Sequence, residues 1–387
     1  MAPVSLALTL LIAGFGVQAG NPVWESTVKL QAPHPVEQLA VDVAGYAIRD
    51  NATHAQAMAK RYVAMRPQAG PGKAKLWPDK TISYCYATEE ARTILYDYLL
   101  AATREWQRKG LFRDVYKYSE VADPGASCTG NSQREKILVI SYNNLGLLST
   151  TLGQPSLDDN DEDYKGPNMA LSERNDVGML DVVSNIAHEL GHAWGLTHEH
   201  QNPYFWAPPL GYGSFANSPF NEDTFNCEAL KDYEEIHRKV QVDAPSEVWL
   251  LCSNRRVASR HGFSAAEFLP ILEDMQFEVT DHNAGYGGVD WDSLMIYPSG
   301  AGGKGSAAPP AAGQDQDAND HRENVLLRKD GQKIKAHFEP SDRDVQGIRK
   351  LYEDSSFPEG QPVLPNNPKS KWYSKLTGKF KKDKCKK

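Results

Sequence analysis

The sequence has a deficit of positive charge and almost no long apolar stretch. Its 42 Lys and Arg residues are outnumbered by 50 Asp and Glu residues, which gives a formal net charge of −8. Such a balance is atypical of proteins that bind a phosphate backbone, so we expect no nucleic-acid partner. Beyond the N-terminal region no run of 18 or more apolar residues follows, so we expect no membrane anchor.

The one apolar run lies close to the N-terminus. Residues Val4 to Val17 are too few to span a bilayer comfortably, and Val17-Gln18-Ala19 matches a small-residue cleavage site. No lysine or arginine precedes the run, which leaves the terminal amine as its only positive charge. A buried N-terminal strand is the alternative. We predict a signal peptide over residues 1–19 and a secreted, extracellular protein.

Cysteine is scarce, with five residues in 387. Secretion allows disulfides, and four cysteines allow three connectivities. Closeness in the sequence favours Cys85 with Cys128 and Cys227 with Cys252. Cys385, near the C-terminus, is then the expected free thiol.

Three histidines, a glutamate and a glycine stand in the spacing HExxHxxGxxH: His188, Glu189, His192, Gly195 and His198. On a helix, His188 and His192 lie on one face, where both can bind one metal ion. Gly195 can adopt the positive φ that ends a helix and lets the chain return with His198. A lone histidine is usually an ordinary core or surface residue, but five fixed positions favour a metal site.

The apolar pattern predicts the helix that carries this motif. Over residues 178–194 apolar side chains recur at three- and four-residue steps on the face opposite the histidines: Met179, Val182, Val183, Ile186 and Leu190. Three neutral imidazoles bind Zn²⁺ and leave a fourth position for water. We expect one catalytic Zn²⁺ ion, with Glu189 as the base that takes the proton of water.

A second motif lies downstream, in WDSLMIYP from Trp291 to Pro298. Together with Glu199, which follows the third histidine, it resembles the astacin family of metzincin zinc endopeptidases. The resemblance implies that Met295 forms a turn beneath the metal and that Glu199 supports the site. It also implies that Tyr297 is a fifth, movable zinc ligand whose hydroxyl stabilises the oxyanion. A packing role in the turn is the alternative for Tyr297.

Two other functions remain open. Serralysin-like proteases share the tyrosine, but they usually carry glycine-rich calcium repeats that this sequence lacks. A secreted binding protein could keep zinc as a purely structural feature. Glu189 argues against that alternative, because a structural site has no use for a base beside an open coordination position.

The resemblance implies an α+β catalytic domain over residues 76–353, with a twisted, mostly parallel sheet and an irregular C-terminal subdomain. LWPDKTISYCY, from Leu76, resembles its first strand, and the helix that follows has Thr88 as its cap and Gly110 at its end. KILVISY, residues 136–142, reads as a central strand. The resemblance also implies that the next segment is an edge strand, which binds an extended substrate backbone. Its residues are Ser149, Thr150, Thr151 and Leu152.

Flanking and connecting segments complete the prediction. Residues 20–75 end in a loop-like stretch that proteases can reach; they read as a pro-segment of a zymogen and carry the N-glycosylation sequon at Asn51. We expect an insertion over about 205–285, a flexible loop over 299–323 and a disordered tail over 354–387, first Pro-rich and then Lys-rich.

The acidic run DDNDED, residues 158–163, invites a Ca²⁺ site. An EF-hand would need a glycine and a twelfth-position glutamate where this chain has Tyr164 and Ala170, so a solvated acidic loop is the preferred interpretation. Taken together, the sequence predicts a monomeric, secreted metalloendopeptidase that hydrolyses peptide bonds of proteins or peptides.

Overall fold

The computed structural model describes residues 25–28, 63–65, 75–155, 165–272, 277–279, 288–311, 313–315 and 317–353. Several predictions concern residues outside these ranges and stay predictions. They are the signal peptide at 1–19, the sequon at Asn51, the acidic run at 158–163, the thiol of Cys385 and the tail at 354–387.

A six-stranded sheet forms one half of the fold, in the order β1-β6-β7-β5-β3-β4. Every neighbouring pair is parallel except β6 and β7, which run antiparallel. This arrangement, with helices alongside, confirms the predicted α+β class. The strands are β1 (Glu25–Val28), β3 (Thr81–Tyr86), β4 (Lys117–Glu120), β5 (Leu138–Tyr142), β6 (Leu148–Thr151) and β7 (Asn168–Leu171).

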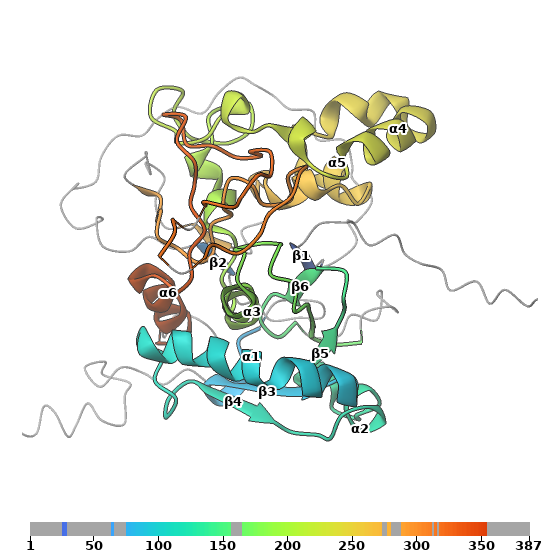
Figure 1. Cartoon of the computed structure of the whole chain (residues 1–387), viewed down its shortest axis with the longest axis vertical. Coiled ribbons are helices and arrows are strands. Elements are labelled where there is room, and N and C mark those ends of the chain that lie inside the picture. Colours follow the sequence, from blue (N-terminus) through green and yellow to red (C-terminus); the bar gives the residue numbers. More distant parts are fainter. Residues whose placement is uncertain are drawn as a thin grey trace, which may run out of the picture.

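Six α-helices are present in the described part of the chain: α1 (Glu89–Arg108), α2 (Ala126–Thr129), α3 (Val182–Trp194), α4 (Tyr233–Asp243), α5 (Arg255–Arg260) and α6 (Asp342–Glu353). Short 3₁₀ helices join them: Pro78–Lys80, Arg134–Lys136, Glu199–Gln201, Pro203–Phe205, Glu222–Thr224, Cys227–Ala229, Pro245–Leu250 and Ser264–Glu267. In Figure 1, α3 lies between the part that holds the sheet and α1 and the part that holds α4 and α5.

Helix α1 packs directly on α3, the helix that carries the histidines. The Thr88 side chain accepts from the Ala91 N–H and caps α1, as predicted, and Gly110 follows the helix with a φ of 117°. The Trp106 indole N–H donates to the Ala187 carbonyl at 2.8 Å. Trp106 therefore fixes α3 against α1.

Helix α3 is shorter than the predicted helix over 178–194. It begins at Val182, because the Asp181 side chain accepts from the Ser184 N–H at 2.8 Å and caps it there. Gly178 and Leu180 have positive φ values, 58° and 60°, which no α-helix contains. The apolar periodicity continued past the cap because Met179 is also buried.

The second half of the chain is largely irregular, as expected, and includes α4 and α5 within the predicted insertion. The segment over 299–323, predicted to be a flexible loop, has buried residues at both of its ends. Ser299 and Ala301 are buried, and the Arg322 guanidinium forms a buried ion pair with Asp320 at 2.8 Å. Low sequence complexity did not prevent burial, because small side chains fit closely against neighbouring backbone.

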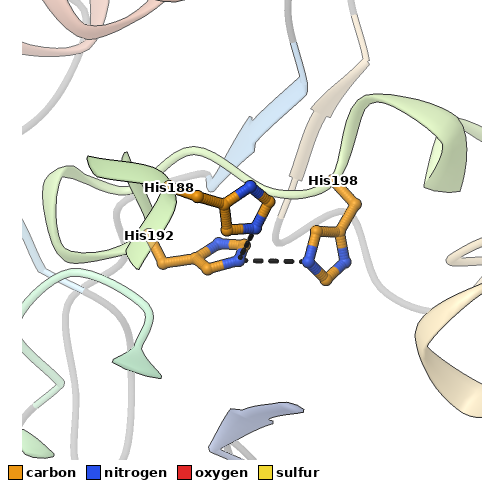
Figure 2. A group of neighbouring side chains, drawn as sticks. All are labelled: His188, His192 and His198. Atoms are coloured by element: carbon orange, nitrogen blue, oxygen red, sulfur yellow. Dashed lines mark hydrogen bonds between the residues drawn. The ribbon is translucent and has the colours of Figure 1, made fainter. Parts of the chain in front are cut away.

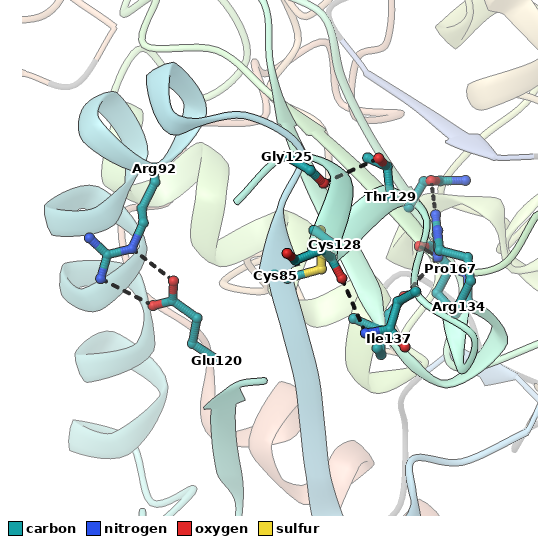
Figure 3. Close-up of a disulfide and its surroundings, with 12 residues drawn as sticks. Cys85, Arg92, Glu120, Gly125, Cys128, Thr129, Arg134, Ile137 and Pro167 are labelled. Atoms are coloured by element: carbon teal, nitrogen blue, oxygen red, sulfur yellow. Dashed lines mark hydrogen bonds and ion pairs between the residues drawn. A yellow bond between two sulfur atoms is a disulfide. The ribbon is translucent and has the colours of Figure 1, made fainter. Parts of the chain in front are cut away.

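Both predicted disulfides are present. Cys85–Cys128 joins β3 to α2 and packs with Ile137 and Val139 (Figure 3). Figure 3 also shows the ion pair between the Arg92 guanidinium on α1 and the Glu120 carboxylate at the end of β4, which are 2.7 Å apart. Cys227–Cys252 closes the segment that contains α4. Among the described residues, no helix combines the length and apolar character needed to cross a membrane.

Residues before Leu76 contribute two short strands to this body. β2 (Val63–Met65) pairs antiparallel with β8 (Phe277–Val279), and β1 pairs with β6. Ala64 and Met65 are fully buried, and the Met65 N–H donates to the Gly195 carbonyl at 2.8 Å. A pro-segment that runs to residue 75 would therefore include residues of the hydrophobic core.

Candidate metal centre

Three imidazoles converge at the C-terminal end of α3 (Figure 2). His188 and His192 lie one helical turn apart, and the chain turns at Gly195, whose φ is 105°, to bring His198 back beside them. The Nε2 atom of His192 is 3.1 Å from Nε2 of His188 and 3.1 Å from Nε2 of His198. All three side chains are fully buried.

The opposite nitrogen of each ring has an oxygen partner. Nδ1 of His188 is 2.7 Å from the Leu294 carbonyl, and Nδ1 of His192 is 2.8 Å from the Leu196 carbonyl. Nδ1 of His198 is 2.8 Å from Oε1 of Gln201. An oxygen acceptor requires that each Nδ1 carries the proton, so each Nε2 presents a lone pair.

The Nε2 lone pair of His192 lies 3.1 Å from each of the other two Nε2 atoms, and all three atoms lie within 4.8 Å of one another, so the lone pairs repel unless a cation lies among them. A tetrahedral Zn²⁺ ion with bonds of about 2.0–2.1 Å to imidazole separates its nitrogen ligands by roughly 3.3 Å. The cluster thus has the donor type, number and spacing that Zn²⁺ requires, and it leaves a fourth coordination position. The residues present fit the ion.

Glu189 lies on α3 beside the first histidine, and its side chain is fully buried. A carboxylate removed from bulk water is costly unless it has polar partners, so its presence next to three imidazoles calls for a role there. Glu189 follows His188 by one residue and precedes His192 by three, and the helix fixes its position relative to both.

The predicted methionine turn lies directly under α3. A Cβ atom added at Gly191 would come within 2.4 Å of the Met295 sulfur, so the glycine in the middle of the helix gives Met295 its space. The Glu199 N–H donates to the Met295 carbonyl at 3.0 Å. Because Leu294 in the same turn is the partner of His188, the turn and the first histidine are positioned together.

Tyr297 is fully buried, and its ring centroid lies 4.3 Å from that of His198 and 6.1 Å from that of His188. It also contacts the rings of His200 and Phe268, at 4.7 Å and 5.0 Å. The ring therefore belongs to the wall of the histidine cluster. This placement agrees with either predicted role, as a ligand or as a packing residue.

Glu199 and two aspartates form a buried acidic network beneath the site. The Glu199 carboxylate accepts from the Asp290 N–H at 2.9 Å, and Asp290 accepts from the Ser341 hydroxyl at 2.5 Å. Burial raises the pKa of the Glu199 carboxyl well above its usual range, and it raises the pKa of Asp290 as well. Glu199, the residue after His198, is thus hydrogen-bonded to Asp290, the residue directly before the methionine-turn motif.

Asp344, on the first turn of α6, completes this network. It accepts from the Ser293 hydroxyl at 2.6 Å, from the Leu294 N–H at 2.8 Å and from the Ser341 N–H at 2.9 Å. The Ser341 hydroxyl also accepts from the Asp344 N–H, so Ser341 caps α6. The closing helix thereby holds the residue whose carbonyl orients His188.

The predicted substrate strand is present as β6, but it is not the last strand of the sheet. Its residues Leu148 to Thr151 pair in parallel with Glu25 to Val28, and β1 also contacts the 3₁₀ helix Ser264–Glu267. Thr150, Thr151 and Leu152 are buried, and Ser149 is half-buried. The sequence pattern could not reveal this pairing, because β-strand partners far apart in the chain leave no local trace.

The site residues that were not predicted from the sequence include Gln201 and Asp344. Gln201 stands three residues after His198, a spacing at which one turn can bring two side chains together. Asp344 follows the Ser341 cap by three residues, as acidic residues at helix starts often do. Neither spacing identifies a contact to the metal-binding residues without the tertiary structure.

Comparisons with known proteins give structural likenesses only. No protein-family model matches the chain, and no curated protein does. High choriolytic enzyme 1, a hatching-enzyme zinc protease of the medaka fish Oryzias latipes, matches at 14% identity and a TM-score of 0.36, over 72% of this chain and 93% of its own. Myroilysin matches at 14% identity and a TM-score of 0.33, over 75% of this chain and 91% of its own.

At such identities and TM-scores the likenesses do not decide what this chain does. The functional argument therefore depends on the histidine cluster, its hydrogen-bonded partners and the buried glutamate beside it. These features together form a site that can bind Zn²⁺ and that has a carboxylate next to it.

Proposed function

We propose that this protein is a secreted, zinc-dependent endopeptidase of the astacin-like type, with its catalytic domain over residues 76–353. The observation that carries the proposal is the convergence of three Nε2 atoms, each on a ring whose Nδ1 faces an oxygen. His188, His192 and His198 would hold the ion, and Tyr297 would be a further, movable ligand. The two disulfides support an extracellular location.

A bound Zn²⁺ ion lowers the pKa of a coordinated water and polarises a carbonyl oxygen. The residues of the chain supply the remaining chemistry. Glu189 accepts the proton of the attacking water and delivers it to the nitrogen of the leaving amine. The Tyr297 hydroxyl donates a hydrogen bond to the oxygen on which negative charge develops. Glu199 and Met295 keep the histidines in position from below.

The substrate we propose is an extended stretch of polypeptide. Strand β6 lies beside α3, and an extended peptide can add to such a strand through backbone hydrogen bonds that do not depend on sequence. This mode suits an endopeptidase that acts on proteins or peptides. In the structure the same strand is paired with Glu25 to Val28, so the N-terminal segment competes with substrate for β6.

Chelation of the metal is the direct test of the proposed function. The purified protein is expected to contain one zinc ion per chain, to lose peptide hydrolysis with a chelator and to regain it when Zn²⁺ is restored. The measurement combines metal analysis with cleavage of a mixed peptide library. Cleavage that resists complete removal of the metal would contradict the proposal.

Competition between the N-terminal segment and substrate for β6 predicts a second result. Deleting residues 20–30 from the secreted chain is expected to raise kcat/KM for an extended peptide by roughly tenfold or more, since a site open only a small fraction of the time binds correspondingly weakly. Zinc content should stay the same, because the histidines and their partners lie elsewhere. Deleting residues 377–387, a similar length at the other end, is the control. Equal kcat/KM in the two deletions would refute the competition.

A further inference from the structure

One of the three histidines differs from the others in the kind of partner that orients it. The rings of His188 and His192 face backbone carbonyls, which any sequence provides. The ring of His198 faces a side chain, the Oε1 atom of Gln201, at 2.8 Å. Only this partner is therefore encoded by the identity of a single residue.

Both ends of the Gln201 side-chain amide form hydrogen bonds. Its Nε2 donates to the Ala266 carbonyl at 3.1 Å and to the Leu269 carbonyl at 3.2 Å. The backbone carbonyl of Gln201 accepts from the Ile271 N–H at 3.0 Å, which ties the backbone to the same segment. The side chain is almost completely buried. Two donated bonds set which end of the amide is oxygen, so the oxygen must face His198.

A neighbouring carboxylate is a possible competitor for the same ring nitrogen. Oε2 of Glu267 is 4.0 Å from Nδ1 of His198, beyond hydrogen-bond distance. The Glu267 backbone carbonyl faces Nε2 of the neighbouring His200 at 2.9 Å. The neutral amide, not the carboxylate, is therefore the direct partner of His198.

We propose that Gln201 is a positioning residue for zinc binding, which fixes His198 with its proton on Nδ1 and its Nε2 lone pair toward the ion. Through Gln201, the segment from Ala266 to Ile271 supports the third ligand. This segment lies in the part of the chain expected to be an insertion, so that insertion contributes to the metal centre. The inference rests on the proposed function only in taking zinc as the ion.

The physical reason is the freedom of the third ligand. His198 follows the helix in an irregular turn, with a backbone φ of −65° and ψ of 132°, so no helix restricts its ring. Without an oriented acceptor, the ring can rotate or carry its proton on Nε2, and neither form binds the ion. Removing such a partner of a zinc ligand typically weakens metal binding by about 10- to 100-fold.

The test measures zinc binding in three variants of the full chain. Gln201→Met keeps the side-chain volume but removes the acceptor, and it is expected to weaken zinc binding about 10- to 100-fold in a competition titration with a chromophoric chelator. Gln154→Met is the matched control: Gln154 is also a buried glutamine, but its side-chain Nε2 has no hydrogen-bond partner among the described residues. That control is expected to bind zinc as the wild type does.

Gln201→Glu separates positioning from stability. One carboxylate oxygen of the glutamate still accepts from His198, but the other oxygen faces the Ala266 and Leu269 carbonyls, which are acceptors too. The variant should therefore unfold more easily, while its zinc affinity stays closer to wild type than that of Gln201→Met. NMR of ¹⁵N-labelled histidine in the zinc-loaded protein should show a slowly exchanging Nδ1–H of His198 in wild type and Gln201→Glu. This signal should be lost in Gln201→Met.

The outcomes separate this inference from the proposed function. Wild-type zinc affinity and an unchanged His198 Nδ1–H signal in Gln201→Met would overturn the positioning role, even if the protein is a zinc protease. Weakened zinc binding in Gln201→Met would support it, even if no peptide is cleaved. A wild-type protein that binds no zinc would overturn both.

Discussion

Glu189→Gln is expected to lower kcat for peptide hydrolysis by about 10²- to 10⁴-fold while the protein keeps its zinc and its fold. The carboxylate lies beside the ligand His188 but is not one of the three converging ligands, so binding and chemistry can be separated at this residue. Glutamine has nearly the same shape but cannot accept a proton at neutral pH. KM should change little, because the lost function belongs to the transition state.

The measurement is steady-state cleavage of a fluorogenic peptide, with zinc content and thermal unfolding recorded on the same sample. Glu173→Gln is the control for a change of one negative charge, since Glu173 is exposed and its carboxylate accepts a hydrogen bond from the Tyr142 hydroxyl. Near-normal turnover in Glu189→Gln, with full zinc content, would rule out Glu189 as the general base.

Asp344→Ala should reduce the free energy of unfolding by about 3 kcal/mol or more, because three buried donors lose their acceptor and each unsatisfied donor costs at least about 1 kcal/mol. The donors are the Ser293 hydroxyl and the N–H groups of Leu294 and Ser341. Since Leu294 also orients His188, zinc affinity should fall together with stability. Urea unfolding of the metal-free protein and a zinc titration measure the two effects.

Asp342→Ala, in the same helical turn but exposed, is the control and should cost only a few tenths of a kcal/mol.

Burial, aided by nearby Asp290, raises the pKa of Asp344 to about 6. A raised pKa gives stability that is fully present below the unfolded value of about 3.9 and is lost as pH rises through 6. The difference between wild type and Asp344→Ala should therefore be larger at pH 4 than at pH 7. A difference that grows with pH would contradict this assignment.

Local patterns predicted the features that depend on a few neighbouring residues. The histidine pair could be assigned to one helix face because four-residue spacing fixes direction, and Thr88 and Gly195 could be assigned to helix ends because capping is a local interaction. Both disulfides followed from closeness in the sequence. The start of α3 was placed too early because a buried Met179 extends the apolar pattern beyond the Asp181 cap.

Contacts between distant segments of the chain could not be predicted from local sequence patterns. The pairing of β1 with β6, the burial of Met65 against Gly195 and the hydrogen bond from Leu294 to Asp344 join residues that are far apart in the chain. Residues 299–303 have the composition of a mobile loop, yet Ser299 and Ala301 are buried. Composition describes what a segment can do alone, whereas burial depends on the surfaces that surround it.

The sequence by itself determined the kind of site this protein carries: three imidazoles in a fixed spacing, a glutamate among them and a glycine that lets the third histidine return. These are properties of residue type and helical periodicity, and both are local. Only the tertiary structure decided how the imidazoles are oriented, because Leu294, Leu196 and Gln201 act through hydrogen bonds whose geometry depends on how separate segments pack. It also decided that β6 is paired with the N-terminal segment, since strand pairing is a contact between distant parts of the chain.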